Sequence, residues 1–140
     1  MDEVKSLVLV VDDEPVVRQL VRRILCREYD VVEAGNGAEA VDMAKAKKPN
    51  IVLMDMMMPE MDGLTACYAI RQDETTREIP VVMVTAVTHE LNRRLSESVM
   101  GASAYITKPF EASELLSTVH EVLERVNGSP DRTGRAVTRA

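Results

Sequence analysis

The sequence predicts an α/β fold in which helices cover both faces of a parallel β-sheet, a doubly wound arrangement. Three observations support this prediction. Five short apolar runs of strand length alternate with five segments of helical periodicity. Buried strands joined by helices are typical of parallel sheets covered on both faces. The chain is 140 residues long, a common size for a single domain.

The first strand and the first helix differ clearly in periodicity. Residues 7–11 (LVLVV) form a continuous apolar run of strand length. Pro15 then begins a helix that runs to Leu25 with its apolar residues on one side. Asp13 or Glu14 can cap this helix, and proline suits its first position.

A second strand, a second helix and a third strand follow. Residues 30–34 (DVVEA) form a short strand. Asn36 begins a helix, with Glu39 three residues later as the partner in a capping box, and this helix ends at the sequence KKPN. The apolar run at residues 51–54 (IVLM) is the third strand.

The second half of the chain repeats the alternation and ends without periodicity. The expected elements are a helix, a strand, a helix, a strand and a last helix, at residues 64–73, 79–86, 89–100, 103–106 and 111–126. The tail contains glycine and proline but no periodic pattern. We therefore expect residues 127–140 to be a disordered tail or the stub of a linker.

Composition excludes several classes of protein. The net charge of −6 (17 basic against 23 acidic residues) disfavours direct binding to nucleic acid. No apolar run approaches the ~20 residues of a membrane span, and the N-terminus lacks the basic leader of a signal peptide. Cys26 and Cys67 stand singly without metal-ligand spacing, so we expect both to be packing residues. These features favour a cytoplasmic protein.

Polar residues gather where the expected strands end. Asp12 and Asp13 follow the first strand, and Asp55 follows the third. Thr85 lies at the end of the fourth strand, and Lys108 follows the fifth. Because parallel strands end at the same edge of a sheet, these side chains are expected to share one site, where doubly wound folds bind ligands.

Three carboxylates, a hydroxyl and an ammonium group suit phosphoryl chemistry. Close carboxylates repel one another unless a cation intervenes, and oxygen ligands without Cys or His select Mg²⁺, with Mn²⁺ as an alternative. An ionised Asp55 beside such a cation can attack phosphorus. Lys108 can neutralise phosphoryl oxygens, and the Thr85 hydroxyl can hydrogen-bond one. The residues therefore predict an aspartyl-phosphate site.

Four motifs also carry a family resemblance. VVDDEP, DMMMPEMDG, VTA and YITKPF, in this order and spacing, resemble the receiver domain of two-component response regulators. The resemblance covers residues 7 to about 126 and implies a flavodoxin-like (βα)₅ fold with strand order 2-1-3-4-5. We therefore expect a receiver domain at residues 1–126.

The resemblance implies roles for the acidic residues. Asp55 is the expected phosphoacceptor. Asp13 is expected to bind Mg²⁺ directly and Asp12 largely through water, while Asp55 and the backbone carbonyl of Met57 complete the metal site. By the same match, the phosphoryl donor is a histidine kinase or a phosphotransfer protein.

The resemblance also implies a conformational switch. Thr85 and Lys108 are expected to contact the phosphoryl group, with a cis peptide bond between Lys108 and Pro109. Tyr105 is the expected aromatic switch residue, although a tyrosine at this place is by itself more often a half-buried strand residue. The output face would combine the helix at 89–100 with the fifth strand and the last helix. One more residue separates Thr85 from Lys108 than is usual in the family.

The favoured function is a phosphorylation-dependent signalling switch. It would act on an unidentified downstream protein or output domain, as a monomer or weak dimer. It would not be an enzyme, apart from catalysing its own phosphorylation and dephosphorylation. A receiver-like binding module that is never phosphorylated is the first alternative, but such modules usually lack one of these acids or the lysine. A magnesium-dependent phosphohydrolase is less favoured, because it usually needs an acid two residues after the nucleophile, where this chain has Met57.

Overall fold

The computed structural model describes residues 4–86 and 102–128. Its strands form one parallel sheet in the order β2-β1-β3-β4-β5, which confirms the predicted fold and strand order. The strands are β1 (Leu7–Val11), β2 (Asp30–Ala34), β3 (Ile51–Met54), β4 (Val81–Thr85) and β5 (Ala104–Thr107). The helices in the described part are α1 (Pro15–Leu25), α2 (Gly37–Lys47), α3 (Gly63–Gln72) and α5 (Ala112–Gly128). The helix expected at 89–100 lies outside the described residues.

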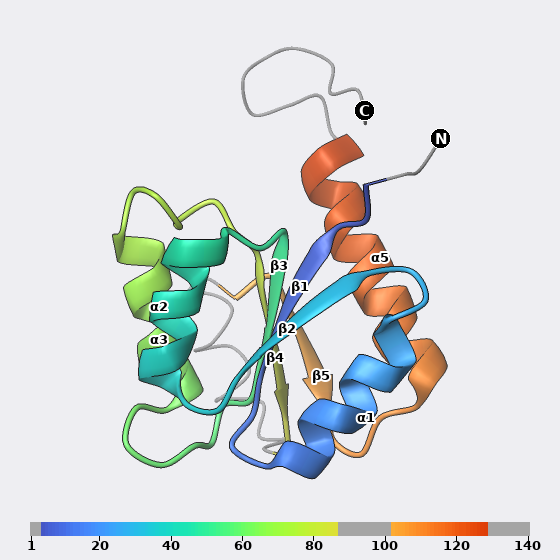
Figure 1. The fold of residues 1–140 in the computed structure, drawn as a ribbon, viewed down its shortest axis with the longest axis horizontal. Coiled ribbons are helices and arrows are strands. Elements are labelled where there is room, and N and C mark those ends of the chain that lie inside the picture. Colours follow the sequence, from blue (N-terminus) through green and yellow to red (C-terminus); the bar gives the residue numbers. More distant parts are fainter. Residues whose placement is uncertain (1–3, 87–101, 129–140) are drawn as a thin grey trace.

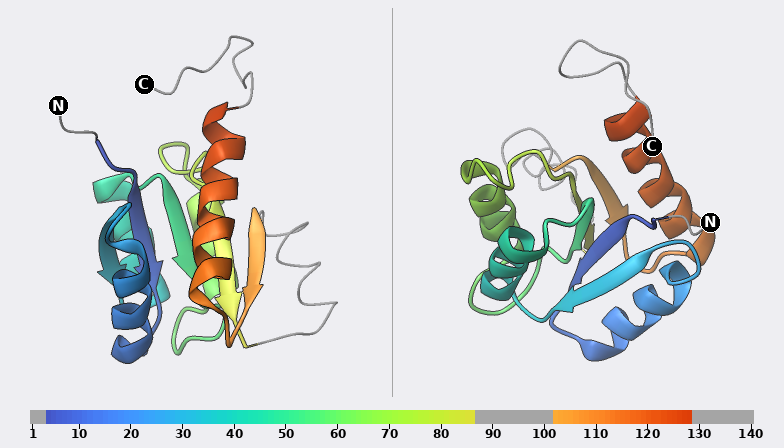
Figure 2. Two further views of the ribbon diagram at one scale, coloured as in Figure 1. Left: turned by 90° about the vertical axis from the view of Figure 1, so that its right-hand side faces the viewer. Right: turned by 45° about the horizontal axis from the view of Figure 1, so that its top comes forward.

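Two layers of helices enclose the sheet. Helices α2 and α3 cover one face, and α1 and α5 cover the other (Figure 1, with further views in Figure 2). Alternate residues of β1 pack against the two helix layers, because successive side chains of a strand point to opposite faces of the sheet. Leu9 and Val11 pack in the core under α2 and α3, whereas Val8 and Val10 pack under α1 and α5. Both faces of the sheet are therefore buried, as the apolar strands predicted.

The helix starts agree only partly with the sequence signals. Asn36 caps α2 as expected, since its side chain accepts a hydrogen bond from the Glu39 backbone N–H. The Glu39 side chain accepts from the Gly35 N–H rather than from the N–H of the cap residue. Glu14 occupies the N-cap position of α1, but its side chain makes no capping bond. The predicted side-chain cap of α1 is therefore wrong for Glu14, and the Asp12 carboxylate binds the Glu14 N–H instead.

The remaining differences are small. Helix α3 begins one residue earlier than expected, because the Asp62 side chain caps it by accepting from the Thr65 N–H. Cys67 is buried in the core as expected, but Cys26 is exposed, so the packing role predicted for Cys26 is wrong. In the described part of the chain, no helix combines the length and apolarity that a membrane crossing requires.

Candidate functional site

Asp55 is held at the carboxyl edge of the sheet by backbone contacts. All four residues of β3 are buried, and the chain leaves the strand at Asp55. The Asp55 N–H donates to the Val11 carbonyl at 3.0 Å, which continues the sheet pairing by one residue. The carboxylate accepts from the Met57 N–H at 3.2 Å, and only 7% of the residue is exposed. Asp55 therefore presents a charged group that has little freedom to move.

A glycine secures the loop that follows Asp55. The Gly63 N–H donates to the Met56 carbonyl at 2.9 Å, which brings the start of α3 against the loop after Asp55. A Cβ atom at Gly63 would lie 2.1 Å from the Asp55 carbonyl oxygen. This approach is open only to glycine.

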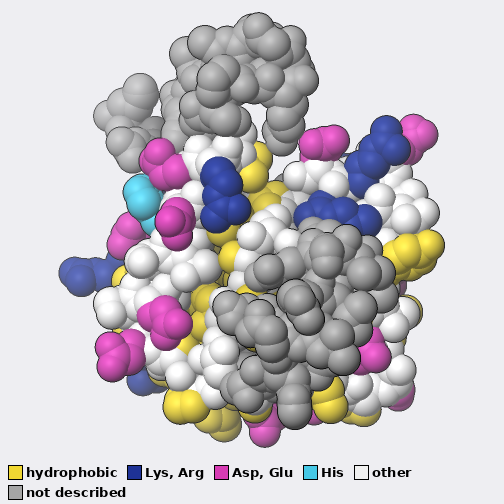
Figure 3. Space-filling view, turned by 180° about the vertical axis from the view of Figure 1, so that it is seen from behind, with side chains coloured by type: hydrophobic (Ala, Val, Ile, Leu, Met, Phe, Trp, Pro, Cys, Tyr) yellow, Lys and Arg dark blue, Asp and Glu magenta, His cyan; other side chains and the backbone are white. Residues whose placement is uncertain are grey.

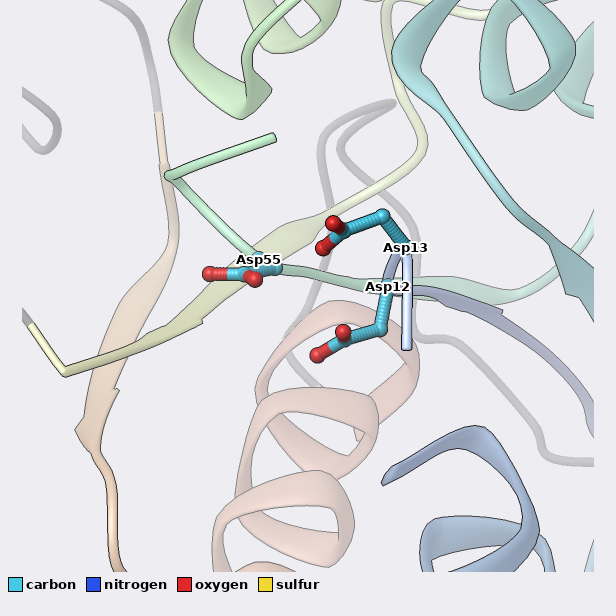
Figure 4. Close-up of side chains that lie close together, drawn as sticks. All are labelled: Asp12, Asp13 and Asp55. Atoms are coloured by element: carbon cyan, nitrogen blue, oxygen red, sulfur yellow. The ribbon is translucent and has the colours of Figure 1, made fainter. Parts of the chain in front are cut away.

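Asp12 and Asp13 bring two further carboxylates to the same edge. Both side chains extend from the end of β1 toward the side of Asp55 (Figure 4). Asp12 is buried, and its carboxylate accepts from the Glu14 N–H at 2.9 Å and from Lys108 Nζ at 2.8 Å. Asp13 is exposed and lines the pocket above Asp55. One oxygen from each of the three carboxylates lies within 4.8 Å of the other two.

Lys108 reaches the acidic cluster from the end of β5. Its Nζ atom lies 2.8 Å from Asp12 Oδ2 and 3.5 Å from Asp55 Oδ2, so it contacts both buried carboxylates. The peptide bond between Lys108 and Pro109 is cis, in agreement with the expectation. Burial by itself lowers the pKa of Lys108. The hydrogen bond to Asp12 and the charges of Asp55 and Asp12 outweigh burial, so the pKa is raised and the ammonium stays charged.

The electrostatics of Asp55 are unfavourable without a further cation. Burial raises the pKa of Asp55, the Lys108 charge lowers it, and the Asp12 charge raises it again, with a net upward shift. Three carboxylates thus face one ammonium group. The pocket above them has a volume of about 320 Å³ and is lined by Asp13, Glu14, Asp55, Met57, Ala86 and Lys108.

This donor set fits a hard divalent cation. All the side-chain ligands are carboxylate oxygens, which Mg²⁺ prefers, and the cluster contains neither His nor Cys. The oxygens are close enough to share one ion, and the exposed Asp13 leaves a side open to water. Residues Asp12, Asp13 and Asp55 would hold the cation, with the Met57 carbonyl as the further ligand that the family resemblance implies.

The comparison with protein families identifies the family to which this fold belongs. Residues 8–120 match the response regulator receiver domain family. The chain belongs to this family. In this receiver, Asp55 follows the third strand, and Lys108 contacts both Asp55 and Asp12.

Individual receiver proteins show the same relationship. The chain is 35% identical over 124 residues to the DNA-binding dual master transcriptional regulator RpaA of a Synechocystis strain, covering 88% of this chain and 51% of RpaA. It is 37% identical over 119 residues to the alkaline phosphatase synthesis transcriptional regulatory protein PhoP of Bacillus subtilis, covering 84% and 48%. The chain thus spans about half the length of these relatives.

A solved receiver structure has nearly the same extent. The chemotaxis protein CheY4 of Vibrio cholerae superposes with a TM-score of 0.80 and 30% sequence identity, covering 84% of this chain and 98% of CheY4. The likeness therefore extends over almost the whole of that receiver.

The residues expected to form the switch are only partly described in the structure. Thr85 ends β4, but its side chain lies outside the described part of the structure, so its predicted contact stays a prediction. Tyr105 lies in β5 beside Met83 of β4 and packs, partly buried, against the core under α2 and α3. Met57 projects into the pocket and is 62% exposed, unlike the neighbouring Met56 and Met58, which are buried.

The sequence interpretation missed three contributors to this receiver's site, namely Glu14, Arg18 and Glu33. Glu14 lines the pocket, and its N–H binds the Asp12 carboxylate. Arg18 donates from Nη1 to the Asp12 carbonyl at 2.6 Å, and from Nε to Glu33 at 2.9 Å. The sequence shows only a charged residue in a helix and another in a strand, 15 positions apart. Only the packing of α1 against β2 brings them together.

Proposed function

We propose that this receiver accepts a phosphoryl group on Asp55 and acts as a phosphorylation-dependent switch. One observation carries the proposal: the buried Asp55 carboxylate faces Lys108 Nζ at 3.5 Å, in an open pocket that Asp13 also lines, and the Asp12 carboxylate belongs to the same acidic cluster. A carboxylate nucleophile, a cation site and an ammonium group for phosphoryl oxygens are the components that aspartyl phosphorylation needs. The proposed donor is a histidine kinase or a phosphotransfer protein.

The proposed transfer is a displacement at phosphorus. One Asp55 carboxylate oxygen forms a bond to phosphorus while the bond from phosphorus to the donor's imidazole nitrogen breaks, and the nitrogen keeps the electron pair. The product is an acyl phosphate. Lys108 stabilises the negative charge on the phosphoryl oxygens, and the Met57 N–H holds the Asp55 carboxylate in place. A divalent cation held by Asp12, Asp13 and Asp55 would supply further neutralisation of the negative charge.

The output of the switch follows from the contacts of Lys108. In the described structure its ammonium group is shared between Asp12 and Asp55. A phosphoryl group on Asp55 adds strong acceptors, which favours a conformation in which Lys108 and the neighbouring β5 residues, Tyr105 among them, rearrange. A receiver whose two states differ by a few kcal/mol is shifted by such a difference in contacts. The proposed output face comprises β5 and α5 together with the helix expected at 89–100, which lies outside the described residues.

The output is proposed to lie in another protein region or partner. RpaA and PhoP are named as transcriptional regulators, which supports a transcriptional output for this domain as well. Direct nucleic-acid binding by the receiver is disfavoured by its net charge of −6. On the face seen in Figure 3, acidic and basic side chains are interspersed, without a continuous basic stripe among the described residues. We place the receiver in the cytoplasm.

Phosphohydrolase activity is a weaker proposal. A hydrolase of this kind needs a second acid to protonate the leaving group and to activate water. The side chain two residues after Asp55 is the thioether of Met57, which lines the pocket and cannot transfer a proton. Self-catalysed loss of one phosphoryl group per cycle is expected, without turnover of external phosphate esters.

Phosphorylation by a small donor tests the proposal. The wild type, incubated with acetyl phosphate and Mg²⁺, should gain one phosphate by intact-mass analysis. Asp55→Asn should gain none, whereas the matched control Asp42→Asn, which changes an exposed aspartate of α2, should be labelled like the wild type. No labelling of the wild type, as expected of a receiver that never accepts phosphate, would contradict the proposal. So would full labelling of Asp55→Asn.

A further inference from the structure

Asp12 is fixed at each of its polar atoms. Its N–H donates to the Ala34 carbonyl at 3.2 Å, and its carbonyl accepts from Arg18 Nη1 at 2.6 Å. One carboxylate oxygen accepts from the Glu14 N–H at 2.9 Å and the other from Lys108 Nζ at 2.8 Å. Two of these four contacts come from side chains, those of Lys108 and Arg18. Lys108 lines the pocket, whereas Arg18 does not.

Arg18 is itself oriented by an ion pair. Its Nε donates to Glu33 Oε1 at 2.9 Å, and Arg22 Nε donates to the second oxygen, Oε2, at 2.7 Å. The side chains of Arg18 and Glu33 are only 19% and 26% exposed, so this pair is better shielded than a surface ion pair. The hydrogen bond from Arg22, and then that from Arg18, keep the pKa of Glu33 below its ordinary value against the effect of burial. Glu33 is therefore a charged anchor for the guanidinium.

The Arg18 contact controls the direction of Asp13. The Asp12 carbonyl and the Asp13 N–H belong to one planar peptide unit, so a hydrogen bond that fixes the carbonyl oxygen also fixes that plane. The Asp13 side chain leaves the backbone directly after it. Without Arg18, the unit can rotate, and Asp13 loses its defined position relative to Asp55.

We propose that Arg18, oriented by Glu33, is a positioning residue that holds the Asp12–Asp13 turn for divalent cation binding. The inference rests on the proposed function, because it concerns the same site, but it assigns the cation affinity to a pair of side chains that touch neither cation nor phosphate. Outer partners of metal ligands typically change metal affinity by ~10–100-fold. We expect about tenfold here, because three other contacts to Asp12 remain.

Charge and positioning predict opposite results for Arg18. The guanidinium is cationic, so by its charge alone it opposes the binding of a second cation to the nearby carboxylates. If charge were its only influence, removing it would tighten Mg²⁺ binding, and Arg18→Lys would leave binding unchanged. A lysine keeps the charge but cannot donate to both the Asp12 carbonyl and Glu33 through one rigid planar group.

The test is a titration of Mg²⁺ followed by amide chemical shifts in NMR spectra. Arg18→Lys should bind Mg²⁺ about tenfold more weakly than the wild type. Glu33→Gln, which leaves Arg18 in place but removes the negative charge of its anchor, should also bind more weakly. The matched control is Arg23→Lys, which makes the same exchange at an exposed position of α1 and should bind like the wild type. Unchanged binding by Arg18→Lys and Glu33→Gln would overturn the inference, as would tighter binding by Arg18→Met.

A second measurement separates positioning from a loss of folding or of function. With acetyl phosphate as donor, Arg18→Lys should need about ten times more Mg²⁺ for half-maximal labelling but reach the wild-type rate at saturation. A general structural defect would lower the saturated rate instead, and that result would count against positioning. If the wild type binds Mg²⁺ but is not labelled, the proposed function fails, while the NMR titration still decides the role of Arg18. A wild type that binds no Mg²⁺ would overturn both.

Discussion

Gly63→Ala should damage both the stability and the phosphorylation of this receiver, and the structure gives the size of the effect. The added Cβ would lie 2.1 Å from the Asp55 carbonyl oxygen, about 0.9 Å inside the 3.0 Å limit that real Cβ contacts respect, and 2.9 Å from Asp55 C and Met56 Cα. All three atoms are backbone atoms, so the loop after Asp55 has to move to relieve the clash. Overpacking typically costs ~1–3 kcal/mol, and replacing glycine in a helix returns up to ~1 kcal/mol. We expect a net loss of about 2 kcal/mol.

Two assays measure the consequences of Gly63→Ala. The midpoint of urea unfolding should fall by ~1 M for an ordinary denaturant slope. The rate of labelling by acetyl phosphate should fall by ~10–100-fold, since a displacement of ~1 Å at a reacting group has effects of that order. The control is Gly35→Ala, where a Cβ would meet its nearest atoms, on Arg18 and Glu39, at 3.5 Å. Equal stability and labelling of Gly63→Ala and Gly35→Ala would refute the reasoning.

Three further predictions concern side chains of the site and its surroundings. Met57→Asn should shorten the lifetime of the acyl phosphate by several-fold, because an amide can orient the attacking water and the exposed thioether cannot. Phosphoprotein decay after removal of the donor measures this lifetime, and an unchanged decay rate would contradict it. Glu33→Gln should lower stability at pH 7 by ~0.5–1 kcal/mol. The pKa of Glu33 is lowered in the folded state, so the difference in stability between the wild type and Glu33→Gln is present above pH 4.5, the ordinary pKa of the group. The difference is lost as the pH falls through the folded-state pKa, and urea unfolding at several pH values measures it. Lys108→Ala should bind Mg²⁺ more tightly, because it removes the ammonium beside Asp12 and Asp55, and yet fail to change conformation when phosphorylated. Weaker Mg²⁺ binding in the NMR titration would contradict the first part, and wild-type spectral changes the second.

The sequence was informative where a single local pattern determined the structure. The run at residues 51–54 has to be buried, and a charge directly after it has to lie at the sheet edge, so the position of Asp55 followed from the pattern alone. The same reasoning placed Asp12 and Lys108 at that edge, and the structure brings both to Asp55. The carboxyl ends of parallel strands lie at the same edge of the sheet, so residues far apart in the sequence could be predicted to form one cluster.

Features that depend on packing between elements were beyond the sequence. Asp13 or Glu14 was expected to cap α1, but no sequence rule shows that the Asp12 carboxylate would bind the Glu14 N–H while the Glu14 side chain makes no capping bond. The pairing of Arg18 with Glu33 depends on how α1 is rotated about its axis relative to β2. Hydrophobic periodicity shows which face of α1 is buried, but it does not give the exact rotation. A hydrogen bond between two side chains depends on that exact rotation.

The contacts of Lys108 connect the proposed cation site with the proposed switch. In the described structure the ammonium lies closer to Asp12, at 2.8 Å, than to Asp55, at 3.5 Å. The Lys108 ammonium therefore occupies Asp12 Oδ2, an oxygen that could also bind a cation at the acidic cluster. A phosphoryl group on Asp55 would offer Lys108 new acceptors and release Asp12 for the cation. Phosphorylation and cation binding then favour each other, and by thermodynamic linkage the coupling is the same in both directions. We therefore expect the switched conformation to be most populated when Asp55 is phosphorylated and the cation is bound.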